Sequence, residues 1–414
     1  MHAVLPPNAT FDPETLANPE EAVARYLAAF PLAPVGVEEV TLANASGRIL
    51  ARDAVAAVPS PADPRSTMDG FAVRAADGMS TRRIVGEIRM GRPPDGPLRA
   101  GEAKRIPPGG VLPPGADAVV PLEDADVSGA RLDVREPVER GAYFTPRGDD
   151  IQAGEVVLPA GRRIGGPELA VLATLGIVEI AVYRQPRVAL ISTGDELVAA
   201  GATPATGQVR DSNRWGLAGT LVALGCVPVH IDVAVDTPQA MRTRLSEGLR
   251  TADAVLLSGG SSVGAHDLTP DIIGSFDGSD VLIHGIKVKP GKPTVFARIG
   301  KSPVLGLPGN PASSLMILEA VMKPILIAMT GELRARRARI ATVAAKPFRG
   351  APGWTWYIPA DLGAGGAVPL PLRSSHVSLL ARSRGYVIVG PDHHGVISTG
   401  EPVEIVPFSA GGRS

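Results

Sequence analysis

Residues 185 to 330 alternate between short apolar runs and amphipathic segments, and this alternation is the strongest constraint on the fold. The apolar runs, expected as buried strands, are Arg187–Ile191, Val227–Val233, Ala254–Leu257 and Pro303–Leu307. The segments expected as helices are Ser212–Leu224, Pro238–Arg250, Leu268–Phe276 and Pro311–Met322. Repeated strand–helix–strand units place parallel strands in one sheet with helices on both faces. We therefore predict a doubly wound parallel α/β domain over residues 185–334.

The remainder of the chain predicts three further domains. A helix opens after Asn18, with Pro19 in its first turn, and residues 151–184 again combine helix and strand. Residues 1–54 plus 151–184 are therefore expected to form one N-terminal mixed α/β domain. Short apolar runs between Pro-rich loops indicate an inserted small β domain over residues 55–150. Similar strands predict a small C-terminal β-barrel domain over residues 335–414.

Composition narrows the classes of function. The 414 residues include 41 basic and 42 acidic side chains, so the net charge of -1 disfavours general nucleic-acid binding. The single cysteine, Cys226, excludes an internal disulfide and a cysteine-based zinc site. Neither a signal-peptide pattern nor a clean 18-residue apolar span is visible in the sequence. We expect a cytoplasmic protein that binds neither nucleic acid nor a membrane.

Small and polar residues gather in the four loops that follow the predicted parallel strands. Because the carboxyl ends of parallel strands meet at one edge of the sheet, ligands bind there. The residues are Thr193, Gly194, Asp195 and Glu196; Asp236; Ser258, Gly259, Gly260, Ser261, Gly264 and Asp267; and Pro308, Gly309, Asn310 and Pro311. Any one of these loops could be only a turn or a helix cap. Four of them at the same edge predict a binding cleft.

This cleft is expected to bind an anion. Backbone N–H groups at helix starts favour phosphate, although the P-loop and Rossmann glycine patterns are both missing. Of the seven lysines, Lys287, Lys289 and Lys292 fall in one predicted hairpin, which is either an exposed charged face or part of an anion site. Glu196, Asp236 and Asp267 offer the oxygen ligands that Mg²⁺ prefers. A phosphoanhydride shared between Mg²⁺ and lysine is therefore predicted.

Six motifs, in this order, resemble the MoeA family, the molybdopterin molybdotransferases, which includes the C-terminal domain of gephyrin. The similarity runs from about residue 15 to 408. The motifs are Met68–Val73, Gly148–Ile151, Ser192–Leu197, Ser258–Gly264, Lys289–Pro293 and Gly306–Pro311. The resemblance implies a transferase of molybdenum cofactor biosynthesis. It would insert molybdate into adenylylated molybdopterin, with release of AMP in a Mg²⁺-dependent step.

The resemblance also implies roles for single residues. Asp236, Asp267, Glu196 and Asp195 become essential acids, and Lys289 and Lys292 become ligand-facing cations. Ser374 and Ser375, followed by His376, match a C-terminal segment near the molybdate pocket. Family members form elongated homodimers, in which the inserted domain of one subunit completes the other's site. This assigns Asp69 and Asp150 to the rim of the partner's site. Molybdopterin adenylyltransferase and molybdoenzyme apo-proteins are the further partners implied.

Two departures from the family pattern favour an alternative. Pro107-Pro108-Gly109-Gly110 stands where relatives carry Thr-Gly-Ala, which removes a hydroxyl and a backbone donor. The stretch beginning Gly353-Trp354 replaces an arginine-bearing one, and lysine does not replicate the planar guanidinium. A catalytically degenerate molybdopterin-binding or scaffold protein of the same fold is therefore the second hypothesis. A molybdopterin adenylyltransferase is the third.

Overall fold

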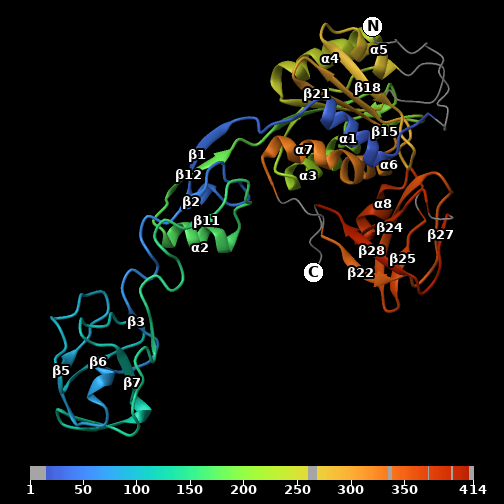
Figure 1. The fold of residues 1–414 in the computed structure, drawn as a ribbon. Helices are drawn as coiled ribbons and strands as arrows, with labels where there is room; N and C mark the ends of the chain where they lie inside the picture. Colours follow the sequence, from blue (N-terminus) through green and yellow to red (C-terminus); the bar gives the residue numbers. More distant parts are fainter. Residues whose placement is uncertain (1–14, 260–267, 334–337, 372, 393–394, 410–414) are drawn as a thin grey trace. The chain divides into compact units, whose positions relative to one another are not determined.

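The computed structural model describes residues 15–259, 268–333, 338–371, 373–392 and 395–409, which divide into two units (Figure 1). Unit 1 comprises Met1–Glu38, Gly47–Ala51 and Ala181–Ser414, and unit 2 comprises Glu39–Ser46 and Arg52–Ile180. The chain therefore leaves unit 1 and returns to it. The paired strands β1 (Val37–Thr41) and β12 (Glu179–Tyr183) lie where it does so.

Unit 1 contains the predicted α/β sheet. Its strands run in the order β16 (Val227–His230), β13 (Arg187–Ser192), β17 (Ala254–Ser258), β21 (Ser302–Leu307), β20 (Val295–Ile299) and β18 (Ser279–His284). The four strands expected from the sequence are parallel to one another. Strands β20 and β18, which the apolar runs did not indicate, add an antiparallel edge. The doubly wound α/β class is confirmed, with a sheet that is mixed at one edge.

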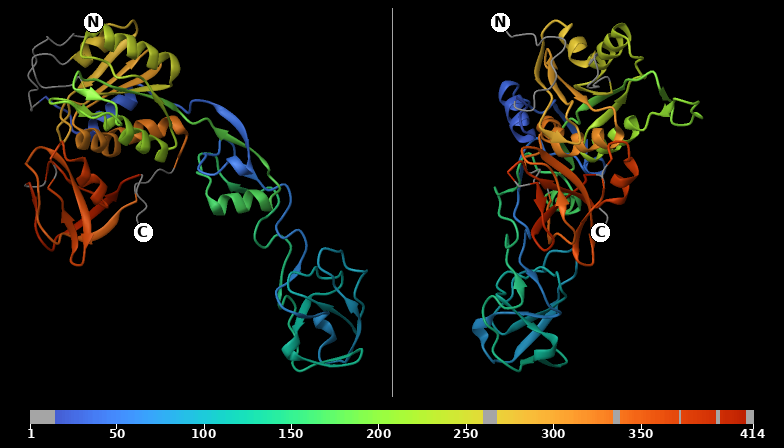
Figure 2. Two further views of the ribbon diagram at one scale, coloured as in Figure 1. Left: turned by 180° about the vertical axis from the view of Figure 1, so that it is seen from behind. Right: turned by 90° about the vertical axis from the view of Figure 1, so that its right-hand side faces the viewer.

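Helices cover both faces of this sheet (Figure 2). They are α1 (Pro19–Ala29), α3 (Asn213–Ala223), α4 (Pro238–Thr251), α5 (Leu268–Gly274), α6 (Pro311–Ile317) and α7 (Lys323–Thr330). Successive side chains of a strand point to opposite faces. In β13, Val188 and Leu190 accordingly pack with α1, α3, α6 and α7, whereas Ala189 and Ile191 pack with α4 and α5.

Helix starts follow the sequence signals in one case and depart from them in another. Helix α4 begins at Pro238, and the Thr237 hydroxyl accepts a hydrogen bond from the Ala240 N–H at 3.3 Å. Helix α1 begins at Pro19 as predicted, but Asn18 makes no side-chain capping bond, so the predicted cap is wrong. Tertiary packing holds this helix instead, since the buried Tyr26 hydroxyl donates to the Ala297 carbonyl at 3.0 Å.

The helical stretch Pro311–Thr330 is long and apolar enough to span a membrane, yet 72% of its apolar window is buried within the protein. It consists of α6, a π-helical turn over Leu318–Met322 and α7. Within the π-helical turn, the buried Glu319 carboxylate accepts bonds from the Ser409 N–H and hydroxyl at 3.0 and 2.8 Å. This stretch is a core element that also holds the far end of the described chain.

The C-terminal part of unit 1 is a second sheet. Its strands run in the order β19 (Val288–Lys289), β24 (Thr355–Gly363), β26 (Gly385–Val389), β28 (Pro402–Pro407) and β22 (Ile340–Val343), with β25 (Gly366–Pro369) beside β24. Smaller elements are β23 (Phe348–Arg349), β27 (Val396–Ile397) and α8 (Val377–Arg382). The predicted lysine hairpin is present, since the segment connects the antiparallel strands β18 and β20 and the Ile286 N–H donates to the Lys292 carbonyl at 3.0 Å. Within it, strand β19 pairs in parallel with β24. Its two residues extend the C-terminal sheet.

Unit 2 contains a six-stranded sheet. The order is β7 (Ala118–Pro121), β4 (Gly70–Val73), β6 (Glu102–Ile106), β5 (Arg82–Glu87), β9 (Arg131–Val134) and β8 (Ala125–Ser128). The two apolar runs predicted as strands lie in β4 and β7, where Phe71 is paired with Val120. Phe71 and Val73 pack into one core, and Ala72 packs into another on the opposite face. This sheet therefore has apolar cores on both sides.

The rest of unit 2 consists of two short strand pairs and one helix. Strand β2 (Ala54–Val55) pairs with β11 (Val156–Leu158), and β3 (Arg65–Ser66) pairs with β10 (Phe144–Thr145). Helix α2 (Gly166–Thr174) begins with a capping box, in which the buried Glu168 carboxylate accepts from the Gly165 N–H at 2.9 Å. Arg162 donates to the same carboxylate at 2.6 and 3.0 Å.

Candidate ligand-binding cavity

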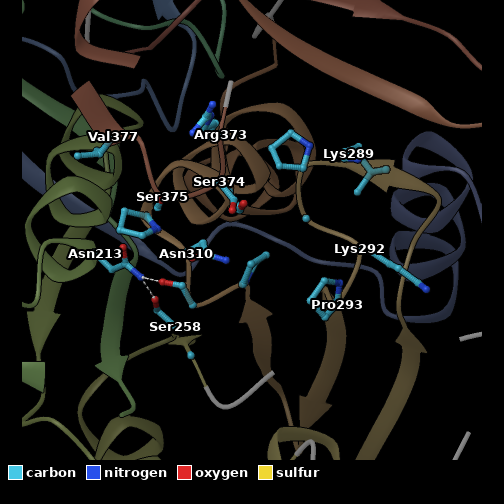
Figure 3. A pocket seen from close by; sticks show the side chains of 18 of the residues that line it. Asn213, Ser258, Lys289, Lys292, Pro293, Asn310, Arg373, Ser374, Ser375 and Val377 are labelled. Carbon is cyan, nitrogen blue, oxygen red and sulfur yellow. Dashed lines mark hydrogen bonds between the residues drawn. The ribbon is translucent and has the colours of Figure 1, made fainter. Parts of the chain in front are cut away.

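A cavity of about 2000 Å³ lies in unit 1, lined by both the α/β sheet edge and the C-terminal β domain (Figure 3). The sheet contributes the loops that follow β13, β16, β17 and β21. The C-terminal domain contributes residues from Pro347 to Val377. The cavity therefore occurs at the predicted edge, but 14 of its 39 lining residues come from the C-terminal domain.

The sequence-predicted loop residues meet on the floor of this cavity. Those that line it are Thr193, Gly194, Glu196, Asp236, Ser258, Gly259, Pro308, Gly309, Asn310 and Pro311. Gly259 has a φ of +101°, and a Cβ there would lie 2.3 Å from the Thr193 carbonyl oxygen. Only glycine allows the two loops to approach so closely. Gly260, Ser261, Gly264 and Asp267 lie outside the described residues.

Asn213, at the start of α3, links two of these loops. Its Nδ2 donates to the Ser258 hydroxyl at 2.6 Å and to the Gly309 carbonyl at 2.7 Å (Figure 3). The side chain is buried, as is that of its neighbour Asp211 on the cavity lining. The sequence pattern predicts only a helix start in this segment and does not indicate the role of Asn213. An Asn close to a helix start, opposite a predicted strand end, is the signal that could have found it.

Three carboxylates form the acidic rim, which we define as Asp195, Glu196 and Asp236. The Asp236 N–H donates to Asp195 Oδ1 at 3.0 Å, and Glu196 and Asp236 line the cavity. Asp236 is exposed overall, but partial desolvation of its carboxylate raises its pKa, and the charges of Asp195 and Glu196 raise it further. The negative charge here is therefore incompletely compensated by the protein.

The predicted metal ligands are brought together only in part. Glu196 and Asp236 share the rim, whereas Asp267 lies outside the described residues. Among the residues that the structure describes, no group of three or more His, Cys, Asp or Glu side chains has a geometry suited to a metal ion. Two carboxylates near each other still provide oxygen ligands of the kind that Mg²⁺ uses with only one or two protein carboxylates.

Four cations form the basic wall, which we define as Lys289, Lys292, Arg349 and Arg373. All four line the cavity. Lys289 and Lys292 were predicted, whereas the two arginines were not assigned a role. Arg349 comes shortly before the stretch that begins Gly353-Trp354, from which the family arginines are missing. Guanidinium groups are therefore present near this stretch. The sequence carries no periodic signal that marks either arginine as a lining residue.

The remaining lining from the C-terminal domain includes the residues expected from the resemblance. Ser374 and Ser375 line the cavity, and the Ser374 carbonyl accepts a bond from the Ala312 N–H of α6 at 3.0 Å. Trp354 and Trp356 also line it, although the ordinary expectation for two alternating tryptophans on a strand is core packing. Trp356 is half-buried and packs against the C-terminal core as well, so that expectation is only partly right.

Asp69, Asp150 and the turn at Pro108 belong to unit 2. The Asp69 carbonyl accepts from the Leu122 N–H at 3.0 Å, and the Asp150 N–H donates to the Ser60 carbonyl at 3.1 Å. In the turn, the Gly109 N–H donates to the Ser66 carbonyl at 2.7 Å. Backbone hydrogen bonds within unit 2 hold these residues in place. Their role at the rim of a partner's site stays a prediction.

The fold and the cavity define a class of protein: a multidomain α/β protein with a cavity at a sheet edge that is lined by carboxylates and cations. Residues 17–176 match the MoeA N-terminal region (domain I and II), and residues 189–328 match a probable molybdopterin binding domain. The chain belongs to the MoeA family, as the following relatives show.

The molybdopterin molybdenumtransferase of Nostoc sp. (strain PCC 7120) is 35% identical over 304 residues, which cover 71% of this chain and 70% of that protein. The protein of the same name from Haemophilus influenzae is 30% identical over 400 residues, covering 94% and 98%. Two crystal structures of the MoeA protein from Pyrococcus horikoshii share its fold, with TM-scores of 0.81 and 0.84 at 30% and 25% identity. Each covers 95% of this chain, and 99% or 100% of its own.

Proposed function

We propose that this protein is a molybdopterin molybdenumtransferase, which inserts molybdenum from molybdate into adenylylated molybdopterin and releases AMP. The observation that carries the proposal is that one cavity is lined both by carboxylates, Glu196 and Asp236, and by the four cations of the basic wall. A ligand with a phosphoanhydride and a second, separate oxyanion needs both. The names of the relatives, and the molybdopterin-binding match over the sheet, support this substrate class.

Bringing the two anions together is the main electrostatic problem of such a reaction. Two unit charges of the same sign repel by about 1 kcal/mol at 4 Å in water, and by several times more in a cavity of lower effective dielectric. Lys289, Lys292 and the two arginines of the basic wall offset this repulsion. We assign the loops at Thr193, Ser258 and Asn310 to the pterin nucleotide, because hydroxyls and close-approaching backbone suit its polar groups.

Mg²⁺ is part of the proposal, with Glu196 and Asp236 as the residues that would hold it. The raised pKa of Asp236 fits this role, because desolvation and its neighbours' negative charges leave an unbalanced site for a hard cation. Asp267 is the third ligand implied by the resemblance. When bound, Mg²⁺ would neutralise charge on the phosphoanhydride.

In the proposed reaction, an oxygen of water or of molybdate attacks a phosphorus of the anhydride. One bridging P–O bond breaks, and its electron pair stays with the departing phosphate group. The cations of the basic wall hold the oxyanion close to the anhydride, and the rim carboxylates would hold the Mg²⁺ that neutralises charge on the anhydride. Positioning of reactants in this way supplies most of what phosphoryl transfer requires from a protein.

The assembly and location of the protein belong to the same proposal. We infer a cytoplasmic homodimer in which Asp69 and Asp150 of one subunit complete the cavity of the other. Molybdopterin adenylyltransferase would supply the substrate, and apo-molybdoenzymes would take the product. Light scattering at micromolar concentration should give the mass of a dimer, and a monomer mass would contradict the shared site.

The direct test supplies adenylylated molybdopterin, Mg²⁺ and molybdate, and follows AMP by chromatography. We expect AMP release that requires all three components, and its loss in Asp267→Asn with an unchanged melting temperature. No AMP at saturating molybdate, with nucleotide still bound, would favour the scaffold function instead. ATP consumption with bare molybdopterin would favour the adenylyltransferase.

A further inference from the structure

We infer that Trp356 is a positioning residue for Lys289, and that its indole face fixes the lysine ammonium group as part of an oxyanion site in the cavity. The inference rests on the proposed function, because it names a further residue for binding molybdate or a similar tetrahedral dianion. It does not follow from the family pattern, in which this stretch carries arginine. It follows from the geometry of the two side chains.

The first observation is the contact itself. The Lys289 Nζ lies 4.8 Å from the centroid of the Trp356 ring, within the range of a cation–π interaction. Both residues line the cavity. An ammonium on an aromatic face in this position is therefore held at the ligand-facing surface and not only within a protein core.

The second observation is that the backbone fixes both partners. Lys289 and Trp356 are register partners in the parallel pair β19–β24, and Trp356 is paired with Val389 of β26 on its other side. The Thr355 N–H donates to the Lys287 carbonyl at 3.1 Å, next to this pair. A Cβ on Gly350 would lie 3.0 Å from the indole Cδ1, so the ring is packed tightly there. Strand pairing thus fixes the backbone of both residues, and the close contact with Gly350 restricts the indole.

The third observation concerns the hydrogen-bonding capacity of the Lys289 side chain. Within the part of the chain that the structure describes, the Lys289 ammonium group has no ion pair and no hydrogen bond, and it lies over the Trp356 ring. An aromatic face attracts the ammonium through its quadrupole without adding a negative charge. A carboxylate partner would instead neutralise the lysine and repel an incoming dianion. The N–H groups of Lys289 are therefore left for the oxygens of a ligand.

The fourth step is the consequence for affinity. A lysine has a long flexible stem, and ordering it on binding costs conformational entropy. An indole that holds the ammonium beforehand removes part of that cost, which lowers the concentration of oxyanion needed to fill the site. Cation–π contacts correspond to roughly threefold to tenfold in binding at partly exposed sites. We expect this range for the Trp356 contribution.

The test compares Trp356→Leu with Trp356→Phe in the full-length protein. Trp356→Leu should raise the KM for molybdate about threefold to tenfold, with little change in kcat at saturating molybdate or in the KM for adenylylated molybdopterin. Trp356→Phe keeps an aromatic face and should recover most of the loss. Trp215→Leu, which removes a 60% exposed tryptophan on α3, is the matched control and should behave as wild type.

A double-mutant cycle with Lys289→Ala shows whether Trp356 acts through the lysine. In the Lys289→Ala background, Trp356→Leu should add little further loss, because the contact is already gone. Additive losses would overturn the inference. So would an unchanged molybdate KM, or equal falls in kcat and nucleotide affinity together with a lower melting temperature, which indicate a structural role only.

A binding measurement separates this inference from the proposed function. Calorimetric titration of the protein with sodium molybdate needs no turnover, and we expect threefold to tenfold weaker binding by Trp356→Leu even if no AMP is ever released. Equal affinity of wild type and Trp356→Leu would overturn the inference, whatever the outcome of the AMP assay. Sodium tungstate, titrated in parallel, should show the same loss of affinity, since the cation–π contact affects binding through the charge of the oxyanion and not through the identity of its metal.

Discussion

The acidic rim and the basic wall face the same cavity but are built in different ways. The rim residues lie on loops that leave the carboxyl ends of parallel strands, so the sheet itself places them. The wall combines Lys289 and Lys292, from the connection between β18 and β20, with Arg349 and Arg373 of the C-terminal domain. Strand β19 joins the two parts by pairing with β24.

This difference separates two tasks. Carboxylates on short loops after buried strands are held close together despite their mutual repulsion, which suits the binding of a cation. Cations from two domains surround a volume large enough for an anion. Because cations do not neutralise one another, their positive charge stays available for a dianion. The comparison therefore predicts that substitutions on the rim alter the dependence on Mg²⁺, whereas substitutions on the wall alter the dependence on molybdate.

The largest effect is expected for Asp236→Asn on the rim. AMP release should fall by at least about 100-fold, because the rim loses one of the two described carboxylates that would hold Mg²⁺. The melting temperature without Mg²⁺ should rise slightly, since the raised pKa of Asp236 shows that its ionised form is unfavourable in the folded protein. Kinetics over a Mg²⁺ series and differential scanning calorimetry check both statements. Normal activity with a normal Mg²⁺ dependence would break the comparison.

A second large effect is expected for Arg349→Ala on the wall. The KM for molybdate should rise roughly 10-fold to 100-fold, the equivalent of one hydrogen bond between charged groups. The concentration of Mg²⁺ for half-maximal rate should not change. Arg349→Lys should recover only part of the loss, because an ammonium group lacks the planar pair of donors. Steady-state kinetics with molybdate and Mg²⁺ varied separately decides whether the wall and the rim are independent.

Asn213 belongs to neither side and should affect stability more than either substrate. Asn213→Ala leaves the Ser258 hydroxyl and the Gly309 carbonyl without a buried donor, at a cost of about 1–3 kcal/mol in the free energy of unfolding. Urea denaturation measures this loss. Because both loops shift, the KM for the nucleotide should rise. The KM for molybdate and the Mg²⁺ concentration for half-maximal rate should keep a constant ratio to each other. A change in the Mg²⁺ dependence alone would assign Asn213 to the acidic rim, and a change in the molybdate dependence alone would assign it to the basic wall.

The parts of the fold that could be predicted are those in which local pattern decides the structure. The parallel strands β13, β17 and β21 are continuous apolar runs because both of their faces are buried, and they were located together with the half-buried edge strand β16. Strands β18 and β20 were missed. The side chains of β18 are mostly half-buried, from Ser279 to His284, so its sequence mixes polar and apolar residues. Tertiary pairing with β20, and not periodicity, determines that edge strand.

The same division holds for the cavity. The floor at Thr193, Ser258 and Asn310 could be predicted because topology alone brings strand ends together. Arg349 and Trp356 could not, because they reach the cavity only through the packing of the C-terminal domain and the short pairing of β19 with β24. Ser374 and Ser375 were identified through family resemblance alone. Long-range contacts of this kind leave no periodic signal in the sequence.

The smallest effect is expected for Glu168→Gln. This substitution removes the Arg162–Glu168 ion pair of unit 2 and provides a reference outside the cavity. Arg162 holds the pKa of the Glu168 carboxyl below its usual value, so the ionised form stabilises the folded state. That stability is fully present above the pKa of the unfolded chain and is lost as the pH falls through the lower folded value. Because Arg162 is partly exposed, we expect a loss of only about 0.5–1 kcal/mol at pH 7, smaller in acid, with AMP release unchanged. Urea denaturation at pH 7 and pH 4 measures it, and an equal loss at both pH values would show that the capping bond to Gly165, and not the charge, is what Glu168 contributes.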